Sequence, residues 1–304
     1  MYKVSLESGL SCPNRDGTIG KSGCIFCNLE SYNPAASPEG RPADAPIASQ
    51  LDEGMRYIRR RHGAEKCIAY FQRGSNTHAP ASSLTPLFAE ALAHPAVSGL
   101  AVSTRPDCIG PDHVEMFEYL SRSKLLWVEL GLQSAHDATL SRIGRGHTAA
   151  QFASACRALQ DAGICVCAHV ILGLPDETAG MMLDTARFLN ETGVWGVKIH
   201  NLHVLRETRL EELYRSGEIA LTPLEIYAGW VADFLEELSP NIVVHRVNGH
   251  SPRNLTVAPE WSVNKLAIFN EVEKELEKRD TRQGKNFIWR ANNHNDNIRQ
   301  NRPV

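Results

Sequence analysis

Short runs of β-branched and apolar residues alternate with helical patterns along the first two thirds of the chain, and this alternation restricts the fold more than any other feature. Six such runs are predicted strands: 2–6, 66–71, 99–104, 125–130, 165–172 and 196–202. The stretches between and after them are predicted helices: 47–62, 84–93, 111–121, 148–162, 178–191 and 207–216. Because strands joined by helical crossovers pair in parallel, the sequence predicts an α/β protein.

Two architectures satisfy this alternation, an open doubly wound sheet and a partial barrel. No G-x-G-x-x-G follows the first strand, and no G-x-x-x-x-G-K-[ST] phosphate loop occurs in the chain. We therefore favour a partial (β/α)6 TIM-type barrel. In either architecture functional residues lie beyond the carboxyl ends of the strands. Polar segments such as "FQRGSNTH", "STRPDC" and "GLPDET" follow the strands here, so we expect them to meet at one mouth.

The rhythm changes near residue 218. A helix over 223–237, a strand over 241–247 and a helix over 263–280 predict a small α+β C-terminal extension, residues 218–280, packed on a barrel of residues 1–217. Residues 281–304 are polar, Asn-rich and net basic, which is typical of a mobile tail.

Composition excludes several classes of protein. The formal net charge of −3 gives no overall field that would attract nucleic acid or an anionic membrane, so such a partner would need a local basic patch such as "RYIRRRHG". The N-terminus lacks a signal-peptide pattern, and no eighteen apolar residues occur in succession. We expect a cytoplasmic protein without a membrane segment.

Three of the eight cysteines lie close together in the loop 11–28, "SCPNRDGTIGKSGCIFCN". Cys12, Cys24 and Cys27 follow the pattern C-x11-C-x2-C. A structural zinc site needs four ligands, so a histidine from another loop would have to complete it. A [4Fe-4S] cluster held by three thiolates instead keeps one iron open for a small molecule. The spacing of the cysteines alone leaves both the zinc site and the [4Fe-4S] cluster open.

The other five cysteines are scattered and are predicted to be buried apolar side chains: Cys67, Cys108, Cys156, Cys165 and Cys167. Their dispersal gives no support for a second cluster.

The loop 11–28 resembles that of radical S-adenosylmethionine (radical SAM) enzymes, although the commonest spacing there is C-x3-C-x2-C. The longer first gap is similar to that of a YhcC-like bacterial subfamily related to the Elp3-like branch. The similarity extends over nearly the whole chain, through "STRPDCI", "WVELGLQSAHDATLSRIGRGH", "HVILGLPDET" and "VKIHNLHVL". Relatives begin upstream of the first strand, so Met1 is expected to mark a truncated or alternatively started chain.

The resemblance implies a reaction mechanism that uses an iron-sulfur cluster. Cys12, Cys24 and Cys27 would hold a [4Fe-4S] cluster whose fourth iron is chelated by the methionine moiety of S-adenosylmethionine (SAM). An electron from a donor such as flavodoxin or ferredoxin would cleave SAM reductively, and the resulting 5′-deoxyadenosyl radical would abstract hydrogen from an unidentified substrate. The Elp3-like relationship implies RNA modification as an alternative. A third alternative is a non-catalytic binding module stabilised by zinc or an Fe-S cluster.

Residues of the matching segments are candidates for contact with SAM. The resemblance places Glu129, Gln133 and Ser134 near the ribose and methionine, and Gln72 and Ser75 near the amino group. Arg145 would pair with the carboxylate, Ile171 and Gly173 would meet the adenine, and Phe26 would present an apolar face beside the cluster. Structural roles, such as ion pairs, helix caps and turns, remain open for them. Further candidates for the pocket wall are Arg105, Asp107, His169, His200 and His203.

Overall fold

Seven strands form one curved sheet in the computed structural model, which describes residues 2–32, 45–249 and 252–288. All neighbouring strands are parallel, in the order β1-β2-β3-β4-β5-β6-β8. Their bounds are Tyr2–Leu6 (β1), Cys67–Phe71 (β2), Val97–Thr104 (β3), Leu125–Gln133 (β4), Cys165–Leu172 (β5), Gly196–Asn201 (β6) and Val243–Arg246 (β8). The partial barrel predicted from the sequence is confirmed.

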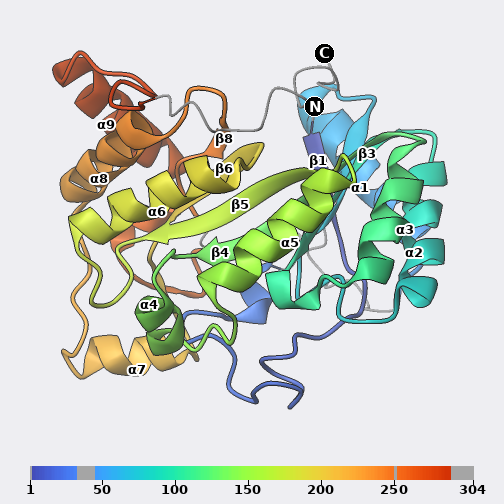
Figure 1. Ribbon diagram of the computed structural model, residues 1–304, viewed down its shortest axis with the longest axis horizontal. Helices are drawn as coiled ribbons and strands as arrows, with labels where there is room; N and C mark the ends of the chain where they lie inside the picture. Colours follow the sequence, from blue (N-terminus) through green and yellow to red (C-terminus); the bar gives the residue numbers. More distant parts are fainter. Residues whose placement is uncertain (1, 33–44, 250–251, 289–304) are drawn as a thin grey trace.

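Helices cover the convex face of this sheet (Figure 1). They are Ile47–His62 (α1), Ala81–Ala93 (α2), Pro111–Ser121 (α3), Ala149–Asp161 (α5), Ala179–Thr192 (α6) and Leu224–Glu237 (α8), with Lys265–Lys278 (α9) packed on α8. Two shorter helices, Asp137–Arg142 (α4) and Arg209–Arg215 (α7), lie with the loop 11–28 at the lower edge of the view. Short 3-10 turns are Leu29–Tyr32, Pro106–Cys108 and Glu260–Val263.

Polar side chains begin several of the helices. The Thr148 hydroxyl accepts a hydrogen bond from the backbone N–H of Gln151, whose side-chain oxygen accepts one from the Thr148 N–H, which is a capping box for α5. Thr178 caps α6 in the same way by accepting from the Met181 N–H. The start at "PDET" that the sequence indicates for this helix is therefore seen.

The seventh strand differs from the sequence expectation. The segment 241–247 is predicted to belong to a separate extension, but β8 pairs with β6 and lengthens the main sheet. A second, small antiparallel sheet joins Val204–Leu205 (β7) to Thr256–Ala258 (β9). Both pairings link segments about 50 residues apart, and such partners leave no local signal in the sequence. The division of the chain after residue 217 remains a prediction, and the tail from 289 onward lies outside the described residues.

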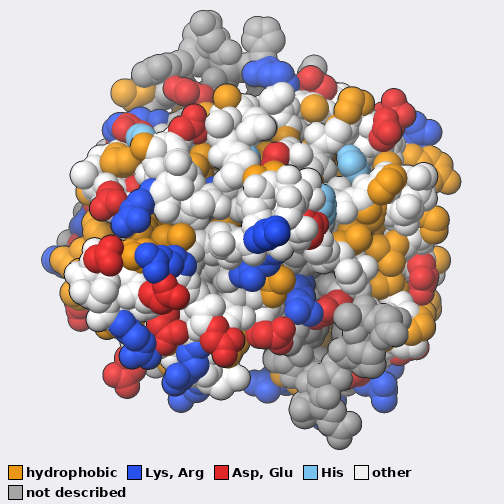
Figure 2. Space-filling view, turned by 90° about the horizontal axis from the view of Figure 1, so that it is seen from below, with side chains coloured by type: hydrophobic (Ala, Val, Ile, Leu, Met, Phe, Trp, Pro, Cys, Tyr) orange, Lys and Arg blue, Asp and Glu red, His pale blue; other side chains and the backbone are white. Residues whose placement is uncertain are grey.

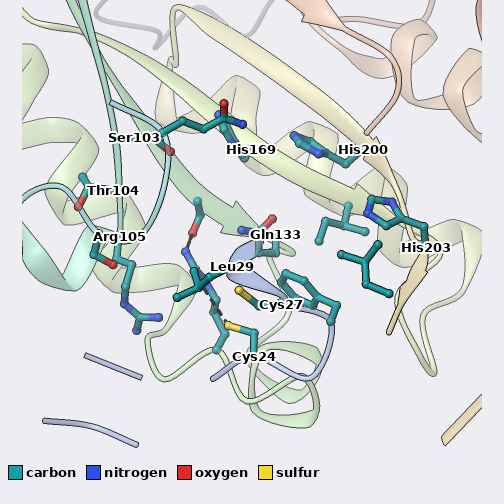
Figure 3. A pocket seen from close by; sticks show the side chains of 18 of the residues that line it. Cys24, Cys27, Leu29, Ser103, Thr104, Arg105, Gln133, His169, His200 and His203 are labelled. Carbon is teal, nitrogen blue, oxygen red and sulfur yellow. Dashed lines mark hydrogen bonds between the residues drawn. The ribbon is translucent and has the colours of Figure 1, made fainter. Parts of the chain in front are cut away.

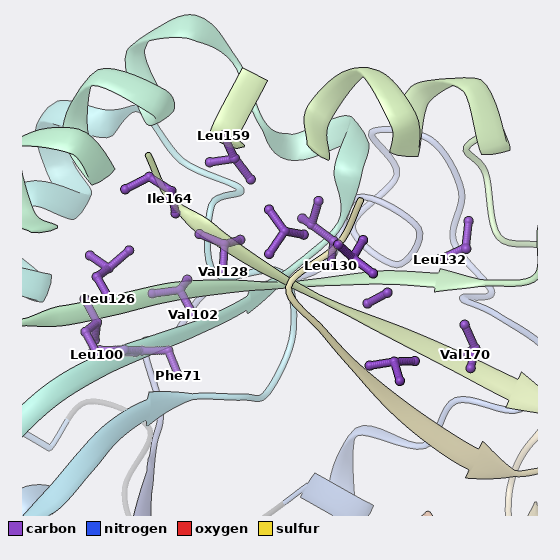
Figure 4. Packing of buried hydrophobic residues seen from close by; sticks show 14 of the residues in the cluster. Phe71, Leu100, Val102, Leu126, Val128, Leu130, Leu132, Leu159, Ile164 and Val170 are labelled. Atoms are coloured by element: carbon purple, nitrogen blue, oxygen red, sulfur yellow. The ribbon is translucent and has the colours of Figure 1, made fainter. Parts of the chain in front are cut away.

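The two faces of the sheet bury different side chains because side chains alternate along a strand. In β4, Leu126, Val128, Leu130 and Leu132 belong to the main apolar core beneath the helices, whereas Trp127 belongs to a smaller cluster on the other face. Figure 4 shows the leucines and valines of neighbouring strands in that core. The concave face carries this smaller cluster together with polar residues of the same strands.

One glycine permits a close approach between helix and sheet. A Cβ added at Gly54 in α1 would lie 2.2 Å from Val4 Cγ1 in β1, which no real Cβ contact allows. Only a residue without a side chain lets α1 pack this closely on the edge strand. Within the described part of the chain, none of the helices has the length and apolar character to cross a membrane.

We predict that Phe88→Ala destabilises the fold by about 3–5 kcal/mol, because Phe88 is fully buried and its ring packs edge-on against Phe71 at 4.9 Å between centroids. Denaturant unfolding measures the free energy of unfolding. Tyr119→Ala on the exposed face of α3 is the control and should change it by less than about 0.5 kcal/mol. Equal losses in the two variants would contradict this account of the core.

Candidate functional site

A cavity opens on the concave side of the sheet, near the carboxyl ends of its strands (Figure 3). Its wall brings together eight of the candidates predicted for metal and SAM: Cys24, Phe26, Cys27, Gln72, Ser75, Gln133, Arg145 and Ile171. These residues come from the loop 11–28 and from β2, β4 and β5 or the segments just after them. The polar segments "FQRGSNTH" and "STRPDC" reach this cavity as expected, whereas "GLPDET" does not line it.

The loop 11–28 holds its shape through its own backbone and through side chains, of which Asn14 ties it to a neighbouring segment. Ile19 N–H donates to Pro13 O at 2.8 Å, and Gly23 N–H donates to Asn14 O at 2.8 Å. The Asn14 amide donates to Gly144 O at 2.7 Å and to Arg145 O at 3.1 Å, which ties the loop to the segment after α4. These bonds hold Cys24 and Cys27 at the cavity wall, where Figure 3 shows their sulfurs next to each other.

Arginines surround the thiols. Arg15 donates to the Cys27 carbonyl, and Arg145 Nη1 lies 3.7 Å from Cys24 Sγ. Burial, together with the neighbouring Cys24, raises the pKa of Cys27 to about 11. Cys12 does not line the cavity, but it lies close enough to raise the pKa of Cys27 further. Three thiols near several cations form a place for a group that carries negative charge.

Two residues of the cavity wall each have a buried polar atom without a hydrogen-bond partner among the described residues: Ser75 Oγ and Arg105 Nη1. The remaining nitrogens of Arg105 are engaged, because Nε and Nη2 donate to the two carboxylate oxygens of Asp107 at 3.0 and 2.9 Å. Arg105 is 2% exposed and Ser75 1% exposed. Because buried polar groups nearly always have a partner, these two donors indicate a ligand in the cavity.

Two hydrogen bonds fix the position of the Arg145 guanidinium. Its Nη2 donates to Gly131 O at 2.8 Å, and its Nε donates to His147 Nε2 at 2.9 Å. Burial and the Arg145 charge lower the pKa of His147 to about 4. The His147 ring is therefore neutral at pH 7 and can accept this bond. The bond fixes the guanidinium with Nη1 toward Cys24.

The backbone at Gln133 is unusual. Gln133 has φ of 77°, which is uncommon for a residue other than glycine, and the pairing of β4 with β5 shifts register between Gly131 and Gln133. The irregularity ends the regular strand where Gln133 reaches the cavity wall. Strained backbone of this kind gathers at functional sites.

Glu129 lies beneath the cavity and not in its wall. Its carboxylate is 0% exposed and accepts hydrogen bonds from five side chains, those of Lys3, Tyr70, Trp127, His169 and Lys198. Burial raises the pKa of Glu129, but Lys198, His169 and Lys3 more than offset this and hold the pKa well below 4.5. Both carboxylate oxygens of Glu129 are fully used by these donors. Glu129 therefore supports the residues of the site and does not itself line the cavity.

Two other candidates are also placed away from the cavity wall. Ser134 is fully buried, and its hydroxyl donates to the Glu177 carboxylate. Gly173 has φ of 83°, and a Cβ there would lie 3.1 Å from Trp230. Both residues shape turns after strands, which is the structural role that the sequence left open. Asp107, likewise outside the cavity wall, serves as the partner of Arg105.

The far end of the cavity is lined by histidines and one arginine. Figure 3 shows His169, His200 and His203 on the opposite side from Cys24 and Cys27. All three were candidates from the sequence. Arg246 in β8 joins them but was not a candidate, because its strand gave no sign of belonging to the barrel. Leu29 and Tyr70 are further wall residues that the sequence analysis missed, while Ser103 and Thr104 belong to "STRPDC", which was expected at the mouth.

The zinc alternative has little geometric support. Among residues 2–32, 45–249 and 252–288, no three His, Cys, Asp or Glu side chains converge closely enough to hold a single metal ion. The three thiols are therefore not arranged as part of a closed tetrahedral site in this structure.

Two family models match the chain. The Radical SAM superfamily matches residues 12–189, and the Radical_SAM C-terminal domain matches residues 194–278. The uncharacterized protein YtqA of Bacillus subtilis is 38% identical over 94% of this chain and 88% of its own length. Protein YhcC of Escherichia coli is 35% identical over 91% of this chain and 87% of its own length. The resemblance seen in the sequence is confirmed.

More distant proteins share the fold. The archaeal Elp3 of Methanocaldococcus infernus superposes with a TM-score of 0.71 at 18% identity, and the match covers 93% of this chain but only 64% of Elp3. A tRNA uridine(34) acetyltransferase of Dehalococcoides mccartyi is 28% identical over 49% of this chain and 32% of its own length. This chain therefore spans only part of both proteins.

We predict that Glu129→Gln destabilises the protein by about 3–5 kcal/mol at pH 7, because it leaves the Lys3 and Lys198 ammonium groups without their counter-charge. Because the folded-state pKa of Glu129 lies below 4.5, its contribution to stability is present above pH 4.5 and is lost as the pH falls further. The difference in the free energy of unfolding between wild type and variant, measured by denaturant unfolding, should therefore become smaller below pH 4.5. Glu118→Gln, which removes the partner of Arg122 at the surface, is the matched control and should stay near wild type.

Proposed function

We propose that this protein, which belongs to the radical SAM superfamily, holds a [4Fe-4S] cluster through Cys12, Cys24 and Cys27 and binds SAM in the adjoining cavity. It is a radical SAM enzyme, as its family match over residues 12–189 indicates. The observation that carries the proposal in detail is the pair of buried, unpartnered donors, Ser75 Oγ and Arg105 Nη1, in the same cavity wall as Cys24 and Cys27. When bound, the two cofactors would supply a 5′-deoxyadenosyl radical that abstracts a hydrogen atom from the substrate.

The residues present fit a cluster. Its thiolate ligands and sulfides carry negative charge, and the cations nearest the cysteines are Arg15, Arg105 and Arg145. Burial lowers the pKa of Arg105, but Asp107, Cys12 and Cys24 raise it overall, so this guanidinium stays charged beside the thiols. We propose that these arginines offset the charge of the loaded site. A one-electron donor such as flavodoxin or ferredoxin would reduce it.

The fit to SAM rests on the polar wall. Arg145 would pair with the carboxylate of the methionine moiety, which suits a planar guanidinium. Ser75 and Gln72, which line the same cavity, would meet its amino group, and Gln133 would reach the ribose. Ile171 and Phe26 supply apolar surface for the purine and the cluster. Glu129 supports this wall from below through His169 and Tyr70.

RNA modification of the Elp3-like type is a second candidate. It is supported by the partial match to the tRNA uridine(34) acetyltransferase and by four arginines on α1, at positions 56, 59, 60 and 61. If RNA is the substrate, adding unmodified tRNA to the reduced enzyme with SAM should raise 5′-deoxyadenosine formation severalfold. A rate unchanged by tRNA, but raised by an RNA-free metabolite extract, would reject this candidate.

We predict that Cys24→Ala abolishes both iron binding and 5′-deoxyadenosine formation from SAM after anaerobic reconstitution, because two thiolates cannot hold the cluster. Iron and sulfide analysis, together with chromatography of the nucleoside product, measures these effects. Cys165→Ala is the control, since Cys165 lies in β5 outside the cavity wall, and it should keep both properties. Stoichiometric zinc in the wild type without SAM cleavage would instead support a non-catalytic binding module.

We predict that Ser75→Ala weakens SAM binding to the reconstituted enzyme about threefold to tenfold, because it removes a buried hydroxyl that has no other partner. Titration calorimetry of the holoenzyme measures the affinity. Ser82→Ala at the exposed start of α2 is the matched control and should bind SAM as the wild type does. Unchanged affinity in Ser75→Ala would remove Ser75 from the SAM site.

A further inference from the structure

We propose that the far end of the cavity, formed by His200, His203 and Arg246, binds an anionic group of the substrate, either a carboxylate or a phosphate. The inference rests on the proposed function, because it takes the molecule in this end of the cavity to be the one that the enzyme transforms. Nothing in the family matches or in the names of the relatives assigns a ligand to these residues.

Arg246 is positioned for a ligand by its strand. It ends β8, and its Cα pairs with that of Lys198 in β6, so both side chains project from the concave face of the sheet. Arg246 Nη2 donates to His200 Nε2 at 2.9 Å. Its Nε is buried and has no hydrogen-bond partner among the described residues, and no ion pair within that part of the chain includes it. Arg246 lines the cavity, and its guanidinium therefore has hydrogen-bonding capacity that no described residue uses.

The charges around Arg246 favour an anion. Among the described residues of the strands, three cations project from the concave face, Lys3, Lys198 and Arg246, whereas the single carboxylate near them is Glu129. That carboxylate is bonded to both lysines. Three positive charges against one negative charge leave two in excess, and Arg246 is the cation that reaches the cavity wall. An arginine without a counter-charge in a partly dry site is stabilised by a charged acceptor, which it can bind with two parallel hydrogen bonds.

The neighbouring histidines do not change the excess of positive charge around Arg246. Burial and the positive charges of Arg246 and Lys198 lower the pKa of His200 well below 6.5, and burial and Lys198 lower that of His169 to about 3. Both rings are therefore neutral at pH 7. A neutral imidazole offers one N–H donor. His169 already donates its N–H to Glu129, whereas His200 accepts from Arg246 at Nε2 and keeps its other N–H for an anion without adding charge.

This anion site is distinct from the one proposed for the SAM carboxylate. Arg145, which would meet that carboxylate, has its Nη1 at 3.7 Å from Cys24 Sγ. His200 and His203 lie on the opposite side of the cavity from Cys24 and Cys27 (Figure 3). Arg145 and Arg105 thus belong to the cysteine end of the cavity, and Arg246 belongs to the opposite end. The geometry assigns the cysteine end to the cofactor and the Arg246 end to the substrate.

The test uses the reconstituted holoenzyme saturated with S-adenosylhomocysteine, which fills the SAM end without turnover. Titration calorimetry with inorganic phosphate, acetate and neutral acetamide then probes the remaining space. We expect one of the anions to bind saturably and acetamide not to bind. Preference for phosphate would indicate a phosphorylated substrate or a nucleic-acid backbone, and preference for acetate would indicate a carboxylic acid.

Arg246→Gln should weaken binding of the preferred anion about tenfold or more, because it removes a charge-assisted pair. Arg187→Gln is the control, since Arg187 lies half-exposed on α6 and away from the cavity, and it should bind like the wild type. Arg246→Lys keeps the charge but loses the bidentate geometry, so an intermediate affinity is expected. If Arg246→Gln does not fold, His203→Gln replaces it and should also lower the affinity for the anion.

Equal binding of acetate and acetamide, or an anion affinity unchanged in Arg246→Gln, would overturn the inference. No anion binding to the wild type would overturn it as well. The proposed function is judged separately, by cluster content and by the change that SAM produces in the electron paramagnetic resonance spectrum of the reduced cluster. Arg246→Gln should leave that change intact. If the protein takes up no cluster, the same anion titration on the protein as isolated still decides the inference.

Discussion

The Glu129 carboxylate connects five of the seven strands of the sheet. It accepts hydrogen bonds from Lys3 in β1, Tyr70 in β2, Trp127 in β4, His169 in β5 and Lys198 in β6. A buried charge is tolerated only when its partners satisfy it, so these side chains have to converge on one point of the concave face. The curvature of the sheet and the position of the cavity above it both depend on this convergence. The network also holds His169 and Tyr70 at the cavity wall.

The two faces of the sheet explain why the fold is a half-barrel and not a doubly wound sheet. A doubly wound sheet has apolar residues on both faces, because helices cover both. Here every second residue of β4 and β6 points to the concave face, and two of them, Glu129 and Lys198, are charged. The convex face carries the apolar core with the helices (Figure 4). Figure 2 shows the molecule from below, with acidic and basic side chains interspersed on that surface.

Much of the site was predictable because its residues follow strand ends. Cys24 and Cys27 were predicted from their spacing, and Ser75, Gln133 and Ile171 from the resemblance to radical SAM enzymes; the structure brings all five to one cavity. Glu129 was predicted as a direct contact, yet the alternation of side chains and the lysines from other strands place it below the wall. Arg246 was missed because the pairing of β8 with β6 joins segments that are distant in sequence. The unpartnered donors of Ser75 and Arg105 could not be predicted either, since a missing partner is a property of the folded environment.

The sequence by itself determined the elements and the chemistry available to them. The periodicity of apolar residues, the threonine caps and the spacing of Cys12, Cys24 and Cys27 are local properties, and local properties are readable along the chain. Only the tertiary structure decided which side chains lie next to each other. It pairs Lys198 with Glu129, and it leaves Arg246 without a counter-charge at the end of the cavity. The physical reason is that electrostatic pairing depends on distances across the sheet, and these are fixed only when the strands have paired.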